Sequence, residues 1–319
     1  MKQNPSSVQI LQIGKKTGRK SPLFYMLRSW QLYVLLAPTI LYLFIFNYVP
    51  MYGIQIAFRD FVANKGITGS PWVGMKHFQY FFSSPQFSSL LVNTVKLSLF
   101  SLLWNFPFPI LLALMLNEVS HIGYKKFVQN VTYMPYFIST VVLVSMLNLF
   151  LAQQDGMINQ VIGALGGTKI DFLGKAAYFR TVYIASGIWQ GTGWSSIIYL
   201  AALSGVDTQL HEAAQIDGAS RIQRVWHINV PCILPTATIL FIMSCGQIMN
   251  VGYEKVYLMQ NSLNMEVSEV ISTYVYKTGL LNVKYSYTTA IGLFNNVINV
   301  VVLLLVNGIS QKLSETSLF

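Results

Sequence analysis

The sequence predicts an all-α membrane protein with six transmembrane helices. Of the 319 residues, 53% are hydrophobic and only 10% are charged, whereas soluble chains carry about 25% charged residues. Apolar runs of about 20 residues, the length a helix needs to cross a bilayer, recur along the chain. Because lipid offers no hydrogen bonds to the backbone, we expect each run to be helical. The six runs cover residues 31–49, 89–116, 130–151, 181–203, 236–251 and 288–307.

The first run follows a basic tail, residues 1–30, which we expect to lie in the cytoplasm. The tail contains no acidic residue, and an excess of Lys and Arg marks cytoplasmic segments. Six spans then return the C-terminal tail, residues 309–319, to the same side. A cleaved signal peptide is the alternative for the first run, but its apolar core would cover only about 7 to 15 residues. The cationic residues of the tail are Lys2, Lys15, Lys16, Arg19, Lys20 and Arg28.

The first helix and its outer loop occupy residues 31–88, and the other five helices form a core over residues 89–308. Long outer loops are expected within residues 50–87, 152–180 and 252–287, where short helices could contact an extracytoplasmic partner. The first inner loop, 117–127, is short, whereas the second, 204–235, is long and polar.

The fifth run is the weakest of the six, because it is short and carries Ser244, Gln247 and Asn250. Pro231 and Pro235 lie just before it. Proline lacks a backbone N–H and clashes with the preceding helical turn, so we expect these two residues to stop the helix that enters this span.

The residue types needed for catalysis are scarce. The chain has 11 acidic residues and four histidines, His77, His121, His211 and His227. None is spaced to form a pair of nucleophile and base, so we expect no enzymatic activity. The two cysteines, Cys232 and Cys245, match no metal-ligand spacing and indicate neither a zinc site nor a disulfide. The segment 14–21 has too few residues between its glycines for a phosphate-binding loop and follows no strand.

Charge inside the predicted spans is equally scarce. Only Lys96 falls within one, near its outer end, where its side chain can reach the interface. A relay of protons or sodium ions would need buried acids or histidines. Energy for transport is therefore expected to come from another subunit, and neutral solutes are favoured over anions.

The second inner loop has the pattern of two short helices at a bend. Asp207 is a good N-cap for a helix that runs to about Asp217. Gly218 can then turn the chain at the C-terminal end. Beyond it an apolar set at helical spacing predicts the second helix. That set is Ile222, Val225, Trp226 and Ile228.

This loop resembles the EAA motif of the membrane subunits of binding-protein-dependent ABC importers, in which Glu-Ala-Ala is followed by Gly and then by Ile-x-Leu-Pro. Val230 stands where the family often has Leu. Further segments that look like the carbohydrate-uptake branch are Trp72-Val73-Gly74, Asn93-Thr94 and residues 285–292. The matching residues of the motif are Glu212, Ala213, Ala214, Asp217, Gly218, Ala219, Ile228 and Pro231.

The resemblance implies the type I ABC importer permease fold and a role as the permease subunit of an oligosaccharide importer. The motif would dock on a cytoplasmic ATPase. Glu212 would make a polar contact to the ATPase or cap the loop, Ala213 and Ala214 would form a close-packed face, and Gly218 would permit the bend. It also implies a second homologous permease, two ATPase subunits that hold ATP and Mg, an extracytoplasmic solute-binding protein, and the plasma membrane of a bacterium. No cofactor or metal is expected on this chain.

Uncharged polar residues at helical spacing on the later spans are candidates for a sugar path, since they can hydrogen-bond hydroxyl groups. Hydrogen bonding between helices is an equally good explanation for each of them. Gly187 and Gly191 have the spacing of a helix-packing motif. An ion-coupled secondary transporter and a permease for another neutral solute remain the alternative functions. The path candidates are Gln190, Trp194, Ser244, Gln247, Asn250, Asn295 and Asn299.

Overall fold

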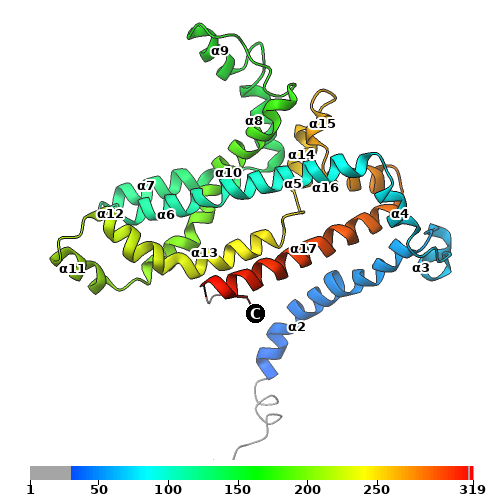
Figure 1. The fold of residues 1–319 in the computed structure, drawn as a ribbon, viewed down its shortest axis with the longest axis horizontal. Coiled ribbons are helices and arrows are strands. Elements are labelled where there is room, and N and C mark those ends of the chain that lie inside the picture. The colour runs from blue at the N-terminus through cyan, green and yellow to red at the C-terminus, as the bar shows by residue number, and fades with distance from the viewer. Residues whose placement is uncertain (1–29, 315–316, 319) are drawn as a thin grey trace, which may run out of the picture. The chain divides into compact units, whose positions relative to one another are not determined.

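The structure is a computed structural model that describes residues 30–314, 317 and 318 (Figure 1). The basic tail and its six cationic residues, Lys2 to Arg28, lie outside the described residues. Most of the described residues are helical, and turns, loops and isolated bridges, such as that between Arg59 and Trp72, connect the helices. It divides into two units, residues 1–53 and 54–319.

The first unit contains α2, Trp30–Leu43, and the π-helical turn η1, Phe44–Tyr48. The 3-10 helix η2, Val49–Phe58, continues from it into the second unit. No side chain from Trp30 to Tyr52 is buried. A helix that is apolar on every side is suited to lipid or to contact with another subunit.

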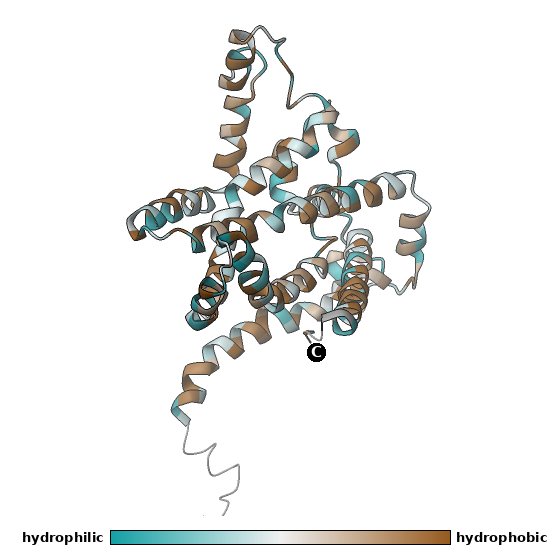
Figure 2. Ribbon diagram, turned by 60° about the vertical axis from the view of Figure 1, so that its left-hand side comes forward, coloured by the Kyte–Doolittle hydropathy of each residue, from teal (hydrophilic) through white to brown (hydrophobic). Residues whose placement is uncertain are grey.

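The second unit is built on long helices joined by short ones, and Figure 2 shows how apolar residues predominate along the long helices. Its shorter helices include α4, Lys76–Phe82; α9, Met157–Ala164; α14, Tyr253–Met259; and α16, Ile271–Val275. The remaining short ones are η3, Ala63–Lys65; α3, Gly66–Gly69; α15, Met265–Ser268; and η6, Tyr276–Leu281.

The long helix α10, Ala176–Ser204, is the centre of this unit. It packs against α5, Gln86–Asn105, against α6, Pro107–Asn117, and against α7, Ile122–Tyr133. The last helix, α17, Tyr285–Ser314, packs against α13, Val230–Cys245. Because α17 runs to Ser314, the predicted C-terminal tail begins as helix.

Four helical stretches of the described chain are long and apolar enough to cross a membrane: Trp30–Phe58, Gln86–Asn117, Arg221–Cys245 and Tyr285–Lys312. A bent pair, Ile122–Phe137 with Thr140–Phe150, brings the count to five if it forms one span. The count of six is therefore not confirmed. The helix that falls short is α10, whose 29 residues would extend over about 44 Å but include polar groups such as Arg180 and Gln190.

The third predicted span, 130–151, is not one continuous helix but contains a break. α7 already begins at Ile122, inside the predicted inner loop, and after η4, Met134–Phe137, the chain bends by 99° into α8, Thr140–Phe150. Pro135 lies at the start of η4, where proline is tolerated. The Ser139 hydroxyl then caps α8 by accepting a hydrogen bond from the backbone N–H of Val142 at 3.4 Å.

The predicted stop at Pro231 and Pro235 is also wrong. Helix continues from α12, Arg221–Arg224, through η5, Val225–Asn229, and on to Cys245. η5 is a π-helical stretch, and Pro231 follows directly after it. The wider turn of a π-helix offers a proline ring more room than the regular hydrogen-bonded turn of an α-helix does. The far end of the run is wrong too, because α13 stops at Cys245 and residues 246–249 form a turn.

Among the three glycines of α10, Gly193 has the least room around it. A Cβ built on this glycine would overlap the carbonyl oxygen of Thr132 in α7. Gly191 has nothing within 4 Å, and Gly187 faces the side chains of Asn105 and Lys255. The predicted packing role of Gly187 and Gly191 therefore belongs to Gly193, one of the helical positions where a side chain has no room.

The Asn93-Thr94 pair fastens α5 to the segment around α15 and α16. Asn93 Nδ2 donates to the carbonyl oxygens of Glu266 and Glu269 at 2.8 and 3.2 Å. Thr94 Oγ1 accepts from the backbone N–H of Ile271 at 2.9 Å. Both side chains are buried, so these hydrogen bonds satisfy backbone groups that water does not reach.

Candidate functional site

The segment predicted as the second inner loop forms a helix, α11, Thr208–Ile216, as the sequence predicts. Asp207 is its N-cap, and its carboxylate accepts a hydrogen bond from the backbone N–H of Gln209 at 2.9 Å. The helix ends at a tight bend around Gly218, whose φ is +80°. A residue with a Cβ is strained in this left-handed region, whereas glycine is not.

Hydrogen bonds close the bend on both sides. The N–H of Ala219 donates to the Ala214 carbonyl at 2.8 Å, and that of Gly218 to the Gln215 carbonyl at 3.1 Å. This pair of bonds is a Schellman motif, which satisfies carbonyls at a helix end. Ser220 and Gln223 then form a reciprocal capping box at the start of α12.

The predicted motif residues lie around this bend. Glu212, Ala213 and Asp217 are exposed, whereas Ala214 and Ala219 are half-buried. The Glu212 carboxylate makes no hydrogen bond or ion pair with any described residue. The caps of the loop are Asp207 and Ser220, so Glu212 is left free to contact a partner.

Large apolar side chains project outward on both sides of the bend. Their exposed fractions are high for hydrophobic residues, at 87% for Ile216, 72% for Ile222, 65% for Trp226 and 50% for Leu210. Apolar groups gathered on a polar loop indicate a surface that another protein covers. We name these four residues the apolar rim.

The other side of the loop is anchored to the helix bundle. Val206, Val225 and Val230 pack against a core cluster that contains Leu203. Asn229 is fully buried, and its Nδ2 donates to Glu118 Oε1 at 3.2 Å, just beyond the end of α6. Ile228 is half-buried and Pro231 is exposed. The sequence reasoning missed the anchoring role of Asn229, because a lone Asn in a helix carries no signal of its partner.

The predicted path residues Ser244, Gln247 and Asn250 come together in one cavity, although not on one helix face. Ser244 lies on α13, and the other two lie beyond its end. They share a cavity of about 240 Å³ with Ser98, Ser101 and Asn105 of α5 and with Tyr183 of α10. We name this cavity the polar chamber.

α5 contributes a row of unsatisfied polar atoms to the chamber. Ser98, Ser101 and Asn105 follow at steps of three and four, so they share one helix face. The two serine Oγ atoms and Asn105 Oδ1 are buried, and none has a hydrogen-bond partner within the described chain. Buried polar atoms are almost always paired, so these atoms indicate a place for a ligand or for water. We name these residues the α5 polar row.

Asn295 and Asn299 of α17 form hydrogen bonds between helices and support the wall of the chamber. Asn299 Oδ1 accepts from the backbone N–H of Met249 at 2.9 Å, and Asn295 Nδ2 donates to Asn250 Oδ1 at 2.9 Å. Both side chains are buried. They shape the turn after α13, which corresponds to the interhelical explanation given for them from the sequence.

Gln190 and Trp194 meet the break between η4 and α8. Gln190 Nε2 donates to the Ile138 carbonyl at 2.8 Å. The Trp194 ring stacks on Tyr136, with centroids 4.7 Å apart. Trp194 also lines a second cavity of about 570 Å³ that includes Asn105 and Ser244, so the two cavities share part of their lining.

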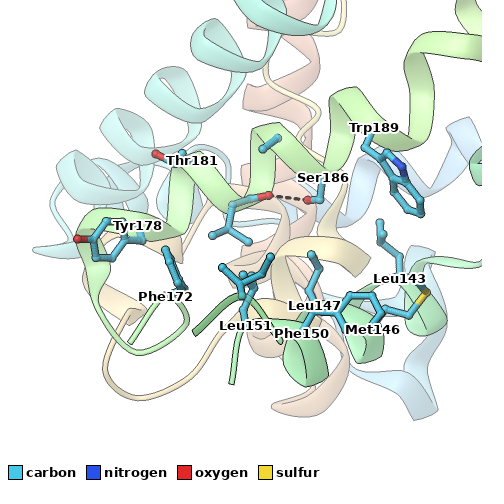
Figure 3. A pocket seen from close by; sticks show the side chains of 13 residues that line it. Leu143, Met146, Leu147, Phe150, Leu151, Phe172, Tyr178, Thr181, Ser186 and Trp189 are labelled. Carbon is cyan, nitrogen blue, oxygen red and sulfur yellow. Dashed lines mark hydrogen bonds between the residues drawn. The ribbon is translucent and has the colours of Figure 1, made fainter. Parts of the chain in front are cut away.

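A third cavity, of about 410 Å³, lies between α8 and α10 and is apolar (Figure 3). Figure 3 shows Leu143 and Leu147 facing α10 across it. The hydroxyl of Ser186 donates to the Val182 carbonyl at 2.6 Å, so it is not available to a ligand. This lining is unsuited to a sugar, which needs polar partners.

The site contains no arrangement suited to metal chemistry. No group of three or more His, Cys, Asp or Glu side chains that could hold a metal ion occurs among residues 30–314. Cys232 is exposed and Cys245 is buried, and both are free thiols.

Residues 87–315 match the family described as "Binding-protein-dependent transport system inner membrane component". The chain belongs to this family. The match covers α5 to α17, and therefore both the bent loop and the polar chamber. Members are transport components and not enzymes, so the chain is the permease subunit of an ABC importer and a multi-pass protein of the inner membrane.

The permease is similar to named proteins over almost its full length. It is 44% identical over 307 residues to the polygalacturonan/rhamnogalacturonan transport system permease protein YteP of Bacillus subtilis, covering 96% of both chains. It is 44% identical to Protein LplB of the same organism, covering 92% of both.

Solved structures support the same assignment. One is a bacterial ABC transporter involved in the import of the acidic polysaccharide alginate. The permease matches it with a TM-score of 0.84 and 41% identity, covering 92% of this chain and 99% of that one. A bacterial alginate ABC transporter in complex with an alginate-pentasaccharide-bound periplasmic protein matches with a TM-score of 0.85 and 39% identity, covering 94% and 100%. The type I importer permease fold is thus confirmed.

Proposed function

We propose that this permease forms half of the translocation path of an ATP-driven importer for acidic oligosaccharides. The observation that carries the proposal is the bent loop around Gly218, which is anchored to the helices on one side and presents the apolar rim on the other. The relative YteP is a permease of a polygalacturonan/rhamnogalacturonan transport system, and a solved relative is involved in the import of the acidic polysaccharide alginate. Both are similar to this chain over nearly its whole length.

The loop is the docking element for a cytoplasmic ATPase. In this role Glu212 contacts the ATPase, Ala213 and Ala214 allow close approach, and Gly218 sets the angle between α11 and α12. Asp217, Ala219, Ile228 and Pro231 maintain the shape of the loop. Closure of the ATPase would push the loop and convert the helices between inward-open and outward-open states.

The complete importer contains further subunits. A second homologous permease completes the path as a heterodimer, and two ATPase subunits hold ATP and Mg. A solute-binding protein delivers the sugar from outside, as suggested by the relative that was solved with its periplasmic protein. This chain itself binds no cofactor. Its N- and C-termini lie in the cytoplasm, on the same side as the loop.

Reconstitution tests the proposal. The permease is co-expressed with its second permease, ATPase and binding protein, and the purified complex is placed in liposomes. We expect ATP-dependent uptake of oligosaccharide fragments of polygalacturonate or alginate, and ATP hydrolysis that the loaded binding protein stimulates. Purification of the permease without an ATPase, or uptake driven by an ion gradient in the absence of ATP, would contradict it.

A further inference from the structure

One cation of the second unit is partly buried beside the polar chamber and has no acidic partner. Lys255 lies on the short helix α14, and its Nζ donates to the Tyr183 carbonyl at 2.9 Å. The ammonium also lies 4.6 Å from the centre of the Tyr183 ring. Salt bridges within the described chain involve Asp60 and Glu269, and neither of them pairs with Lys255.

The ammonium lies near one member of the α5 polar row, Asn105. A Cβ built on Gly187 would lie 3.5 Å from Lys255 Nζ and 3.5 Å from Asn105 Oδ1, so both groups lie beside this glycine. Tyr183, which contacts the lysine, lines the polar chamber together with the row. None of the described residues that line the chamber is acidic.

This combination is specific for an anion with oxygen atoms. An ammonium has three N–H donors, and the structure uses one of them on a carbonyl. The serine hydroxyls can donate as well, and their oxygen atoms are buried without partners. Burying a cation without a counter-ion is unfavourable, and a carboxylate placed here would remove that penalty.

We propose that the polar chamber binds a carboxylate group of a uronic acid residue, with the Lys255 ammonium as its counter-ion and the α5 polar row as its hydrogen-bond partners. The inference rests on the proposed function and adds the residues that would recognise the negative charge of the sugar. Burial lowers the pKa of Lys255 to about 8. The side chain is therefore still charged at pH 7, where uronic acids are ionised.

The sequence did not reveal this site. Lys255 falls within the predicted outer loop 252–287, and the predicted spans contain only Lys96 as a cation. Neutral solutes were favoured over anions from the sequence because the predicted spans contain so few cations. The structure turns Lys255 inward onto the Tyr183 backbone, while Lys96 is exposed, so the relevant cation comes from a connection between spans and not from a span.

Uptake measured with a matched pair of sugars tests the proposal. The probes are the trisaccharide of galacturonic acid and the same trisaccharide with its carboxylates reduced to alcohols, each offered at high concentration to the complete complex in liposomes. The readout is the ratio of acidic to neutral uptake. We expect Lys255→Met to lower this ratio about tenfold or more, because hydrogen bonds to charged groups contribute more than neutral ones. Lys255→Arg retains the charge and should retain most of the ratio.

Two further variants guard against a folding defect. Asn105→Asp is nearly isosteric and places a carboxylate near the ammonium, where it would compete with the carboxylate of the sugar, so it should also lower the ratio. Lys96→Met removes an exposed lysine from α5 and should leave the ratio unchanged. A normal ratio in both Lys255→Met and Asn105→Asp, or an equal fall in Lys96→Met, would overturn the proposal. If the unaltered complex transports neither sugar, the proposed function itself fails, which is a distinct outcome.

Discussion

At the residue scale, the shape of the bent loop around Gly218 depends on the conformation of a single glycine. Gly218 combines a φ of +80° with open space around its Cα, since a Cβ placed there would meet nothing within 4 Å. Any defect of a substituted residue therefore arises from its backbone and not from a clash. A substitution at Gly218 therefore changes the shape of the loop without directly changing the contacts that its side chains make.

Gly218→Ala tests that separation. The left-handed conformation costs about 1–2 kcal/mol for a residue with a Cβ, so we expect the loop to shift and transport to fall, while the protein still inserts and ATP is still hydrolysed. Gly218→Asp should act in the same direction. Gly205→Ala, in the same loop at a negative φ and with only ordinary contact to Ala202, is the control. If both Gly218 variants take up sugar as fast as the unaltered complex, the bend is not needed to transmit the movement of the ATPase to the membrane helices.

A second residue-scale prediction concerns the turn after α13. Asn299→Ala removes the acceptor of the buried Met249 N–H, and an unsatisfied buried donor costs about 1–3 kcal/mol. We expect a lower midpoint of thermal unfolding in detergent. Asn296→Ala removes an exposed amide of the same helix and should leave the midpoint unchanged. Equal midpoints for the two variants would mean that the turn does not depend on α17.

At the element scale, α10 approaches α7 through Gly193. The sequence offered Gly187 and Gly191 for this role because their spacing is that of a packing motif. Spacing alone does not say which face of a helix meets its neighbour. Replacing a helical glycine with alanine normally stabilises the folded protein, because alanine is the less flexible residue. This gain is outweighed only where the added Cβ has no room.

The pair Gly193→Ala and Gly191→Ala measures this difference. Both changes add the same methyl group to α10, but only the first overlaps the Thr132 carbonyl. We expect Gly193→Ala to lower the unfolding midpoint and Gly191→Ala to leave it equal or raise it slightly. The prediction fails if both variants are equally stable.

The elements also show what a sequence can and cannot predict. The ends of α11 followed from Asp207 and Gly218, because caps are local chemistry. The break in the third span and the continuation of helix through Pro231 did not follow. Each depends on a partner far away in the chain, as with Gln190 at the break, or on a π-helical turn that no residue pattern announces. For the same reason Asn229 and Lys255 were missed.

At the scale of the whole molecule, α10 separates two connections. The segment around α9 precedes it, and the bent loop around Gly218 follows it. The 29 residues of α10 would extend over about 44 Å. Although α10 is more polar than the four candidate spans, a helix of this length can cross a bilayer when its polar side chains face other helices. The two connections would then lie on opposite sides of the membrane.

Cysteine labelling measures this sidedness. In a protein with Cys232→Ser and Cys245→Ser, we expect Thr168→Cys to react with a membrane-impermeant maleimide on intact cells or spheroplasts. Thr208→Cys should react only after the membrane is opened. Both threonines are exposed, so accessibility within the protein does not differ. Labelling of both from outside would show that α10 does not cross the membrane.

The unbroken helix from Arg221 to Cys245 has a mechanical consequence. One end begins directly after the bend at Gly218, and the other end carries Ser244 at the edge of the polar chamber. A displacement applied at the bend can be carried along this continuous helical stretch, which would extend over about 38 Å and includes the π-helical segment η5. ATP hydrolysis and sugar release would then be linked by one movement of this helix. Flexibility introduced halfway along it, for example by Pro235→Gly, should leave ATP hydrolysis in place while sugar uptake falls.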